Sequence, residues 1–432
     1  MRYVANLNTL SAVEAARLIA IGEITSEELV KACIDRILIR ENTVQAWEYF
    51  DCNKTLQQAR NLDSQSPKGP LHGIPVGVKD IIDTVDMPTR YGSAIYKDHQ
   101  PSWDASCVAA IRASGGLLLG KTVTTEFAVY NPGKTTNPHN VRHTPGGSSS
   151  GSAAAVADAM VPLALGTQTG GSIIRPAAYC GVVGYKPSYG LINRTGVKPC
   201  ADSLDTVGIF GRDVKDAAAL ASILARRPSL TINESVVDPP RIGICRTHEW
   251  PKAGPEVAVA LKEAERRLEA RTELKEVALP EQFSELGKAH EAVMHFEGAQ
   301  SLSHEYNMHR DLLSNKLKEV ILSGYAVSPA TYDSSLAVGE KCRNLLKDLF
   351  SEAGVDVFLA PSTTGEAPEG LAYTGDPIFN RNWTFLRVPC INIPALKGPR
   401  ELPVGLQVIG QLGRDREALA FSDWIYQCLR RE

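Results

Sequence analysis

The apolar and polar positions of the first 65 residues repeat with the period of an α-helix. The stretch SEELVKACIDRIL places apolar residues three and four positions apart, as the buried face of an amphipathic helix requires. Ser11 with Glu14, and Thr25 with Glu28, have the spacing of a capping box at a helix N-terminus. The pattern therefore predicts that residues 1–65 form an N-terminal helical flank.

From residue 66 onward, short apolar runs typical of β-strands alternate with helical stretches. GIPVGVKDII, GGLLLGKTV and VPLALGT are early strand-type runs, VDVFLAPS and GLQVIGQ are late ones, and residues 282–352 between them are mostly helical. This alternation favours an α/β fold with a layered sheet. Strand-type runs lie on both sides of the proline-rich stretch VVDPPRIG, so we expect a single domain over 1–432. Within it, 66–432 would be a sheet core with helical insertions.

Composition narrows the class of protein. The 432 residues are 43% hydrophobic and 22% charged, which suits a globular protein with a large core. A net charge of −3 gives no reason to expect nucleic acid or an anionic membrane as a partner. No apolar run approaches the roughly 18 residues of a membrane span, and the first residues lack a secretory signal pattern. We therefore expect a cytoplasmic protein with a small-molecule partner.

Cysteine and histidine usage argues against disulfide and metal sites. The nine cysteines are spread along the chain without a CxxC pair, as expected for buried thiols in a reducing compartment. The nine histidines include no HExxH or similar metal-ligand spacing. We therefore predict no metal site.

Two clusters of glycine and serine carry the strongest chemical signal. In TQTGGSIIRPA, Thr169, Gly170, Gly171 and Ser172 follow an apolar run that we predict to be a buried strand. Paired glycines let the backbone turn sharply and leave N–H groups free to receive an oxyanion, beside a serine hydroxyl that could attack a carbonyl. The alternative is a tight turn in which Ser172 only caps the next helix.

The earlier cluster, PGGSSSGSAAAVADAM, has more hydroxyl groups than a helix start needs. One of Ser148, Ser149 and Ser150 is accounted for as the N-cap of the following helix, so another is free to relay a proton. A serine nucleophile also needs a base. His139 and His143 lie nearby, but in a loop that looks exposed.

Lys79, in GIPVGVKDIIDT, is the better candidate for the base. It is the single lysine of an apolar, strand-like run, where loss of hydration should lower its pKa and favour the neutral amine. The alternative is a lysine at a strand end that pairs with Asp80 or Asp83.

Together, GVKD with Lys79, PGGSSSGSAAA and GTQTGGSIIRPAAYCGVVGYKPS resemble the amidase signature family, and the 24-residue step from Ser148 to Ser172 agrees with its pattern. The resemblance implies an α/β/α domain around a large mixed sheet, with a Ser-cisSer-Lys triad. Ser172 would be the acyl-forming nucleophile, Ser148 the bridging serine after a cis peptide, and Lys79 the proton acceptor. The N–H groups of residues 169–172 would form the oxyanion hole. No metal or organic cofactor is implied.

The segment GGSIIRP places arginine at position 175, one place later than in most of that family, and this looks like its malonamidase branch. In that branch the arginine binds a substrate carboxylate, so we expect Arg175, with Thr167 and Ser149, to contact a small carboxylated amide. The alternative is that Arg175 pairs with Asp205 or Asp376. Likeness to malonamidase also suggests a homodimer.

Other functions remain open at this point. Within the family these are an aryl or indole acetamide hydrolase and an amidotransferase A-type subunit. Residues 147–151 also fit GxSxG, but the nucleophile elbow needs a strand directly before it, and NPHNVRHTPG is not one. A different class is a non-catalytic phosphate-binding module, because glycine-rich loops also cradle phosphate.

Overall fold

A computed structural model describes residues 6–232 and 238–430. These residues form one sheet of eleven strands in the order β1-β3-β2-β4-β6-β5-β10-β11-β9-β7-β8. In chain order the strands are β1 (Trp47–Phe50), β2 (Pro75–Lys79), β3 (Leu117–Thr122), β4 (Leu163–Gln168), β5 (Val183–Lys186), β6 (Thr206–Gly211), β7 (Ile242–Ile244), β8 (Leu274–Glu276), β9 (Val357–Pro361), β10 (Cys390–Lys397) and β11 (Pro403–Ile409).

The sheet is mixed, as the family resemblance implied. β2 runs parallel to β3 and β4, and β7 runs parallel to β8 and β9. The strands between these two parallel parts pair antiparallel. Every residue of β2, β3, β4 and β6 is buried, because helices cover both faces of the sheet there.

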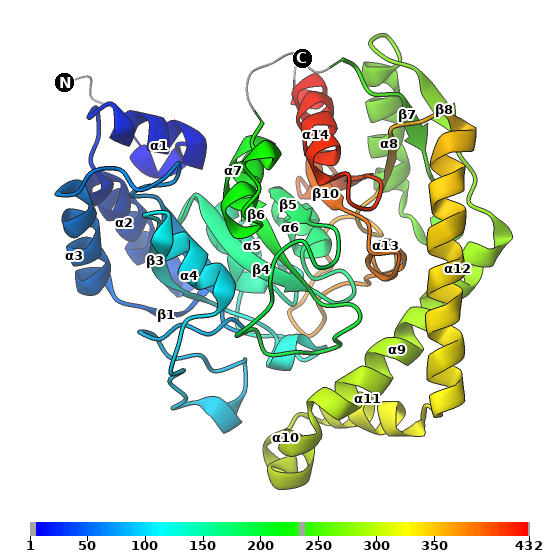
Figure 1. Cartoon of the computed structure of the whole chain (residues 1–432), viewed down its shortest axis with the longest axis horizontal. Helices are drawn as coiled ribbons and strands as arrows, with labels where there is room; N and C mark the ends of the chain where they lie inside the picture. Colours follow the sequence, from blue (N-terminus) through cyan, green and yellow to red (C-terminus); the bar gives the residue numbers. More distant parts are fainter. Residues whose placement is uncertain (1–5, 233–237, 431–432) are drawn as a thin grey trace.

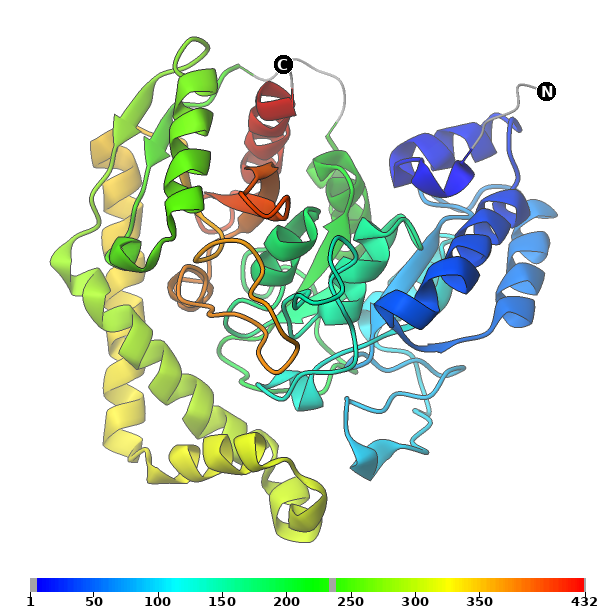
Figure 2. The same ribbon diagram turned by 180° about the vertical axis from the view of Figure 1, so that it is seen from behind.

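Fourteen helices surround the sheet within the described residues (Figures 1 and 2). They are α1 (Ala12–Ala20), α2 (Ser26–Val44), α3 (Cys52–Asp63), α4 (Ser106–Ala113), α5 (Ser150–Ala157), α6 (Ile174–Cys180), α7 (Val214–Leu224), α8 (Pro255–Leu268), α9 (Leu286–Ser301), α10 (Ser303–Met308), α11 (Asn315–Ala326), α12 (Pro329–Ala353), α13 (Arg381–Phe385) and α14 (Asp415–Arg430). α5 and α6 pack together on the central strands, while α4, α7, α14 and α8 form a second connected group. The α/β fold is therefore confirmed.

The N-terminal flank differs from the prediction in one respect. Residues 47–50 are a strand, β1, and not part of a continuous helical segment. β1 pairs antiparallel with β3 at the edge of the sheet, so a tertiary contact decides the conformation of a four-residue run that has no helical period of its own. Thr25 and Glu28 do form the predicted capping box. Ser11 caps α1, but the carboxylate of Glu14 turns to Arg17 instead.

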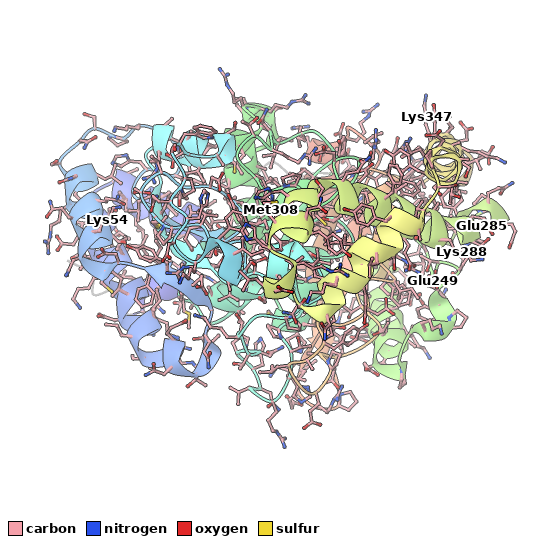
Figure 3. The ribbon with its side chains drawn as sticks, turned by 90° about the horizontal axis from the view of Figure 1, so that it is seen from below. Lys54, Glu249, Glu285, Lys288, Met308 and Lys347 are labelled. Carbon is pink, nitrogen blue, oxygen red and sulfur yellow. The ribbon has the colours of Figure 1, made fainter. Side chains whose placement is uncertain are left out.

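Between β8 and β9 the chain leaves the sheet as a helical arm, α9–α12. α9 packs against both α11 and α12, and Figure 1 shows the arm projecting away from the sheet, with the long α12 at its outer side. Figure 3 looks onto this arm from below, with Met308 marking the end of α10 and Lys347 on α12. The arm matters for function because α9 and α11 form part of the cavity described next.

No helix in the described parts of the chain combines the length and apolar character needed to cross a bilayer.

Candidate active site

Lys79 is the last residue of β2 and has no exposed surface. Its Nζ donates hydrogen bonds to Ser148 Oγ at 2.7 Å and to Thr167 Oγ1 at 2.8 Å. Burial lowers the pKa of Lys79 to about 7, an effect that the charge of Asp205 opposes and that of Arg175 reinforces. A large fraction of Lys79 is therefore neutral near pH 7.

The alternative partners of Lys79 bind elsewhere. Asp80 Oδ1 lies 3.1 Å from Nζ of Lys121, which is also fully buried. Asp83 accepts a hydrogen bond from the hydroxyl of Tyr91. Neither carboxylate is within hydrogen-bond or ion-pair distance of Lys79, so the two hydroxyl groups are the polar partners of its amine among the described residues.

The first glycine-serine cluster forms the turn before α5. Gly146 has a φ of +82°, and a Cβ there would lie 2.8 Å from Cα of Pro176, so the turn requires glycine. The peptide bond between Gly147 and Ser148 is cis. This backbone brings the hydroxyl of Ser148 to Lys79.

As predicted, a serine of this cluster is the N-cap residue of α5, but its hydroxyl does not cap the helix. Ser149 occupies the N-cap position, but its side chain makes no capping hydrogen bond. Instead Ser149 Oγ donates to the carbonyl of Thr167 and accepts from its amide. Ser150 Oγ donates to the carbonyl of Val123. The serines therefore tie the turn to the neighbouring strands.

The second cluster lies between β4 and α6. The side-chain oxygen of Gln168 accepts hydrogen bonds from the amides of Ile173 and Ile174, at 2.8 and 3.0 Å. The start of α6 is therefore satisfied by Gln168, and the alternative role of Ser172 as a helix cap is not seen. The hydroxyl of Ser172 makes no hydrogen bond to the rest of the described chain, and its residue lines a cavity.

The amide groups of the residues from Thr169 to Ser172 donate to no acceptor in the part of the chain that the structure describes. A Cβ at Gly171 would lie 2.5 Å from Oδ1 of Asn380, so the loop can pass this close only with glycine. Unpaired N–H groups beside a serine hydroxyl are suited to stabilise an oxyanion.

The cavity next to these groups encloses about 750 Å³ of empty space, part of which is open to solvent. Ser148, Ser172, Arg175 and Thr374 line it on the side of the sheet, and α9 and α11 contribute on the other side. Both candidate serine hydroxyls therefore reach one shared space, although 24 residues separate them in the sequence.

Arg175 is almost fully buried and lines this cavity. Its Nη2 donates to the carbonyl of Gly147 at 2.7 Å and to Oγ1 of Thr374 at 3.3 Å. Nε and Nη1 have no hydrogen-bond partner within the described residues, and burial lowers the pKa of the guanidinium. Neither Asp205 nor Asp376 pairs with Arg175, so two of its three guanidinium nitrogen atoms are buried without a partner among the described residues.

Thr167 and Ser149 do not occupy the positions expected of substrate contacts. Neither lines the cavity of Ser172. The Thr167 hydroxyl accepts from Lys79, and the Ser149 hydroxyl is bound to the backbone of Thr167. These two residues lie behind the site and hold Lys79 and β4 in place.

Two residues whose role the sequence did not predict hold the loop at Thr169. Asp205 Oδ1 accepts from Thr169 Oγ1 at 2.6 Å, and its Oδ2 accepts from the amides of Cys200 and Ala201. His290 Nε2, on α9, donates to the carbonyl of Thr169 at 2.9 Å. Burial lowers the pKa of His290 to about 4, so this ring is neutral at physiological pH.

Asp205 had a weak sequence signal, because it is the acidic first residue of the strand-type run DTVGIFG, whereas His290 had none. His143, expected in an exposed loop, is instead buried, with Nδ1 bound to the carbonyl of Ala367. It does not line the cavity. No cluster of potential metal ligands occurs in residues 6–232 and 238–430.

Comparisons with known proteins agree on one family. The family model described as Amidase matches residues 28–419. The A-type subunit of the glutamyl-tRNA(Gln) amidotransferase of Natranaerobius thermophilus is 32% identical, with 98% of this chain and 96% of that protein aligned. A solved amidase structure has a TM-score of 0.89 and 31% identity over 97% of this chain and 100% of its own. Peptide amidase from Stenotrophomonas maltophilia has a TM-score of 0.83 and 26% identity, with 98% of both chains covered.

The environment of Lys79 generates a first prediction. NMR of ¹³C-labelled lysine, with the signal assigned through Lys79→Met, should show Lys79 titrating near pH 7. The substitution Asp205→Asn should lower this pKa by about one unit, because it removes a negative charge that favours the ammonium form.

Asp202→Asn is the matched control. Asp202 is on the same loop and also lies near Arg194, but its side chain is 78% exposed, so water screens its charge. The pKa of Lys79 should stay unchanged in this variant. A Lys79 pKa near 10 in the wild type, or equal shifts in the two variants, would contradict the prediction.

Proposed function

The chain belongs to the amidase family, and from this premise we propose that it hydrolyses a small carboxylic acid amide through an acyl-enzyme on Ser172. Enzymes of this family act on the C–N bonds of amides. The observation that carries the proposal is the 2.7 Å hydrogen bond from Lys79 Nζ to Ser148 Oγ, at the cavity that Ser172 lines. These three residues would be the Ser-cisSer-Lys triad.

In the proposed reaction, neutral Lys79 takes the proton of the Ser148 hydroxyl while Ser148 takes that of Ser172. Ser172 Oγ attacks the amide carbonyl carbon, and the carbonyl oxygen becomes an oxyanion at the amides of residues 169–172. The intermediate then collapses with cleavage of the C–N bond. The proton returns through Ser148 to the departing nitrogen, so ammonia or an amine leaves. Water attacks the ester in the same way, which releases the acid and restores Ser172.

The environment of Lys79 suits this role. A general base works best when its pKa lies near the operating pH, because it is then both deprotonated and basic enough to accept a proton. A pKa of about 7 meets that condition, whereas an exposed lysine would be almost fully protonated. The burial of β2 is therefore part of the proposed mechanism.

We further propose that the substrate carries a carboxylate that binds Arg175, as in a malonamidase. Two nitrogen atoms of this buried guanidinium have no partner among the described residues. A planar fork with free donors is the preferred partner of a carboxylate, and its burial strengthens the interaction. Arg175 also lies close to Ser148, through its bond to the Gly147 carbonyl, so a short amide acid such as malonamate would fit.

A second candidate is the release of ammonia from glutamine, as part of a larger assembly. The observation that favours it is the match, over 98% of this chain, to the A-type subunit of a glutamyl-tRNA(Gln) amidotransferase. Glutamine also combines a primary amide with a carboxylate, so the same triad and Arg175 would serve. The two candidates therefore differ in acyl chain length and in the need for partner subunits.

Removal of any triad side chain should abolish turnover. Lys79→Met, Ser148→Ala and Ser172→Ala should each lower kcat/KM for malonamate by about 10³-fold or more, measured as ammonia release. Ser150→Ala is the control from the same cluster, because its hydroxyl contacts only the Val123 carbonyl, and it should keep most activity. A Ser172→Ala variant that retains activity would refute the acyl-enzyme.

The pH profile should follow the pKa of Lys79. Below about pH 7 the amine is protonated and cannot accept a proton, so kcat/KM should fall about tenfold per pH unit as the pH decreases. Above this pH the profile should be level. An acid limb near pH 4, where His290 titrates, would point to a different base.

The role of Arg175 is tested by selectivity. Arg175→Met keeps much of the side-chain volume and should raise KM for malonamate and glutamine about tenfold or more, since a charge-assisted hydrogen bond is lost. Acetamide and phenylacetamide should change little. An equal effect on charged and neutral amides would defeat the assignment. In the wild type, higher kcat/KM for malonamate than for glutamine would favour the first candidate, and faster turnover of phenylacetamide would favour an aryl amide hydrolase.

A further inference from the structure

The cavity has an apolar wall that the proposed chemistry does not use. Met294 and Gly298 on α9, Leu302 just after it, and Val320 and Ile321 on α11 face the same space as Ser172. α9 and α11 lie side by side in Figures 1 and 2 and pack against each other. This wall belongs to the helical arm, whereas the triad candidates belong to the sheet and its loops.

The spacing along α9 explains how one helix forms this wall. His290, Met294 and Gly298 are four residues apart, so they lie on one face of the helix. His290 binds the carbonyl of Thr169, which fixes the start of the wall beside the candidate oxyanion loop. From there to Gly298 the helix rises by about 12 Å. The wall therefore spans the site from the reacting groups outward.

Gly298 leaves space in this wall, although helix packing does not require a glycine at this position. A Cβ built there would meet only the carbonyl oxygen of Cys200, at an ordinary 3.7 Å. Gly324 on α11 is different, because a Cβ there would lie 2.0 Å from the carbonyl oxygen of His295, so close helix contact demands glycine. Glycine inside a helix is destabilising relative to alanine. Because no close helix contact requires glycine at position 298, its absent side chain leaves space in the cavity.

The cavity also offers apolar surface that malonamate would leave uncovered. Met294 and Val320 line it, and both side chains are partly exposed. Apolar side chains that face water in an empty cavity gain free energy when a ligand covers them. A carboxylate at Arg175 and an amide at Ser172 would leave the side chains of Met294 and Val320 uncovered, whereas Ile321 has no surface exposed to water.

We propose that the substrate is an amide acid with an apolar substituent of branched-alkyl or phenyl size, seated on Met294 and Val320 in the space left by Gly298. This inference rests on the proposed function, which places the carboxylate of the substrate at Arg175 and its amide carbonyl at Ser172. Gly298 is then a residue that determines specificity.

Malonamates substituted at carbon 2 are suitable probes, because they carry the carboxylate, the amide and the apolar substituent on one short carbon framework. Ammonia release from malonamate, 2-methylmalonamate, 2-isobutylmalonamate and 2-benzylmalonamate gives kcat/KM across the series. We expect a gain of about fourfold for each methylene that becomes buried, so the two larger amides should exceed malonamate at least tenfold.

Gly298→Leu fills the proposed space and should reverse this preference. We expect kcat/KM for the benzyl and isobutyl amides to fall at least tenfold, while the value for malonamate stays within about twofold. Gln300→Leu is the matched control, since it adds the same side chain to an exposed position of the same helix. It should leave the whole series unchanged.

Met294→Ala provides a second variant should Gly298→Leu fail to fold, because it enlarges the space and should favour the benzyl over the isobutyl amide. The inference is overturned if substituted malonamates are slower than malonamate in the wild type, or if Gly298→Leu slows all members equally. Acetamide and 3-methylbutanamide separate this inference from the carboxylate proposal. A preference for 3-methylbutanamide that Gly298→Leu removes supports the apolar wall even if no amide acid is hydrolysed.

Discussion

The candidate site depends on one amine, that of Lys79, which is fully buried and still within hydrogen-bond distance of two hydroxyl groups. Lys79 ends a strand that is buried on both faces, and the two groups that receive its hydrogen bonds are alcohols. A carboxylate partner would stabilise the ammonium form and raise its pKa. In this protein Asp80 and Asp83 bind Lys121 and Tyr91 instead, while Asp205 acts on Lys79 only through its charge. The separation of these acids from the amine is what would allow Lys79 to serve as the proposed base.

The rest of the candidate site consists of supports for two loops that must approach each other. Ser149 ties the first loop to β4, and Gln168 ties the second loop to α6. Asp205 and His290 hold the side chain and the carbonyl of Thr169. These contacts occupy the hydroxyl and carbonyl groups around the loops but leave the amides from Thr169 to Ser172 unpaired within the described residues. Such preorganised donors lose little free energy by reorienting during a reaction.

The cavity joins two parts of the molecule with different roles. The sheet and its loops provide the polar groups of the proposed chemistry, and the arm of α9 and α11 provides the apolar wall of the proposed substrate site. His290 connects the two, because it is on α9 and binds the loop at Thr169. A change in the arm that leaves His290 in place would therefore alter the shape of the cavity with little effect on the proposed triad. This arrangement would allow the preference for a substrate to vary while the proposed reaction stays the same.

The sequence by itself determined the α/β class, most strands and helices, and the residues Lys79, Ser148, Ser172 and Arg175 as the chemical groups to examine. It could do so because burial, helical period and glycine-serine turns are local patterns. It did not identify the strand β1, the capping behaviour of Ser149, or the contacts of Asp205 and His290. Each of these depends on which distant segment packs alongside, and a backbone or polar group chooses its partner only once the chain has brought that segment near. The cavity and its apolar wall were likewise decided by tertiary structure alone, because Gly298 and Ser172 line one cavity only once the arm has packed beside the loops of the sheet.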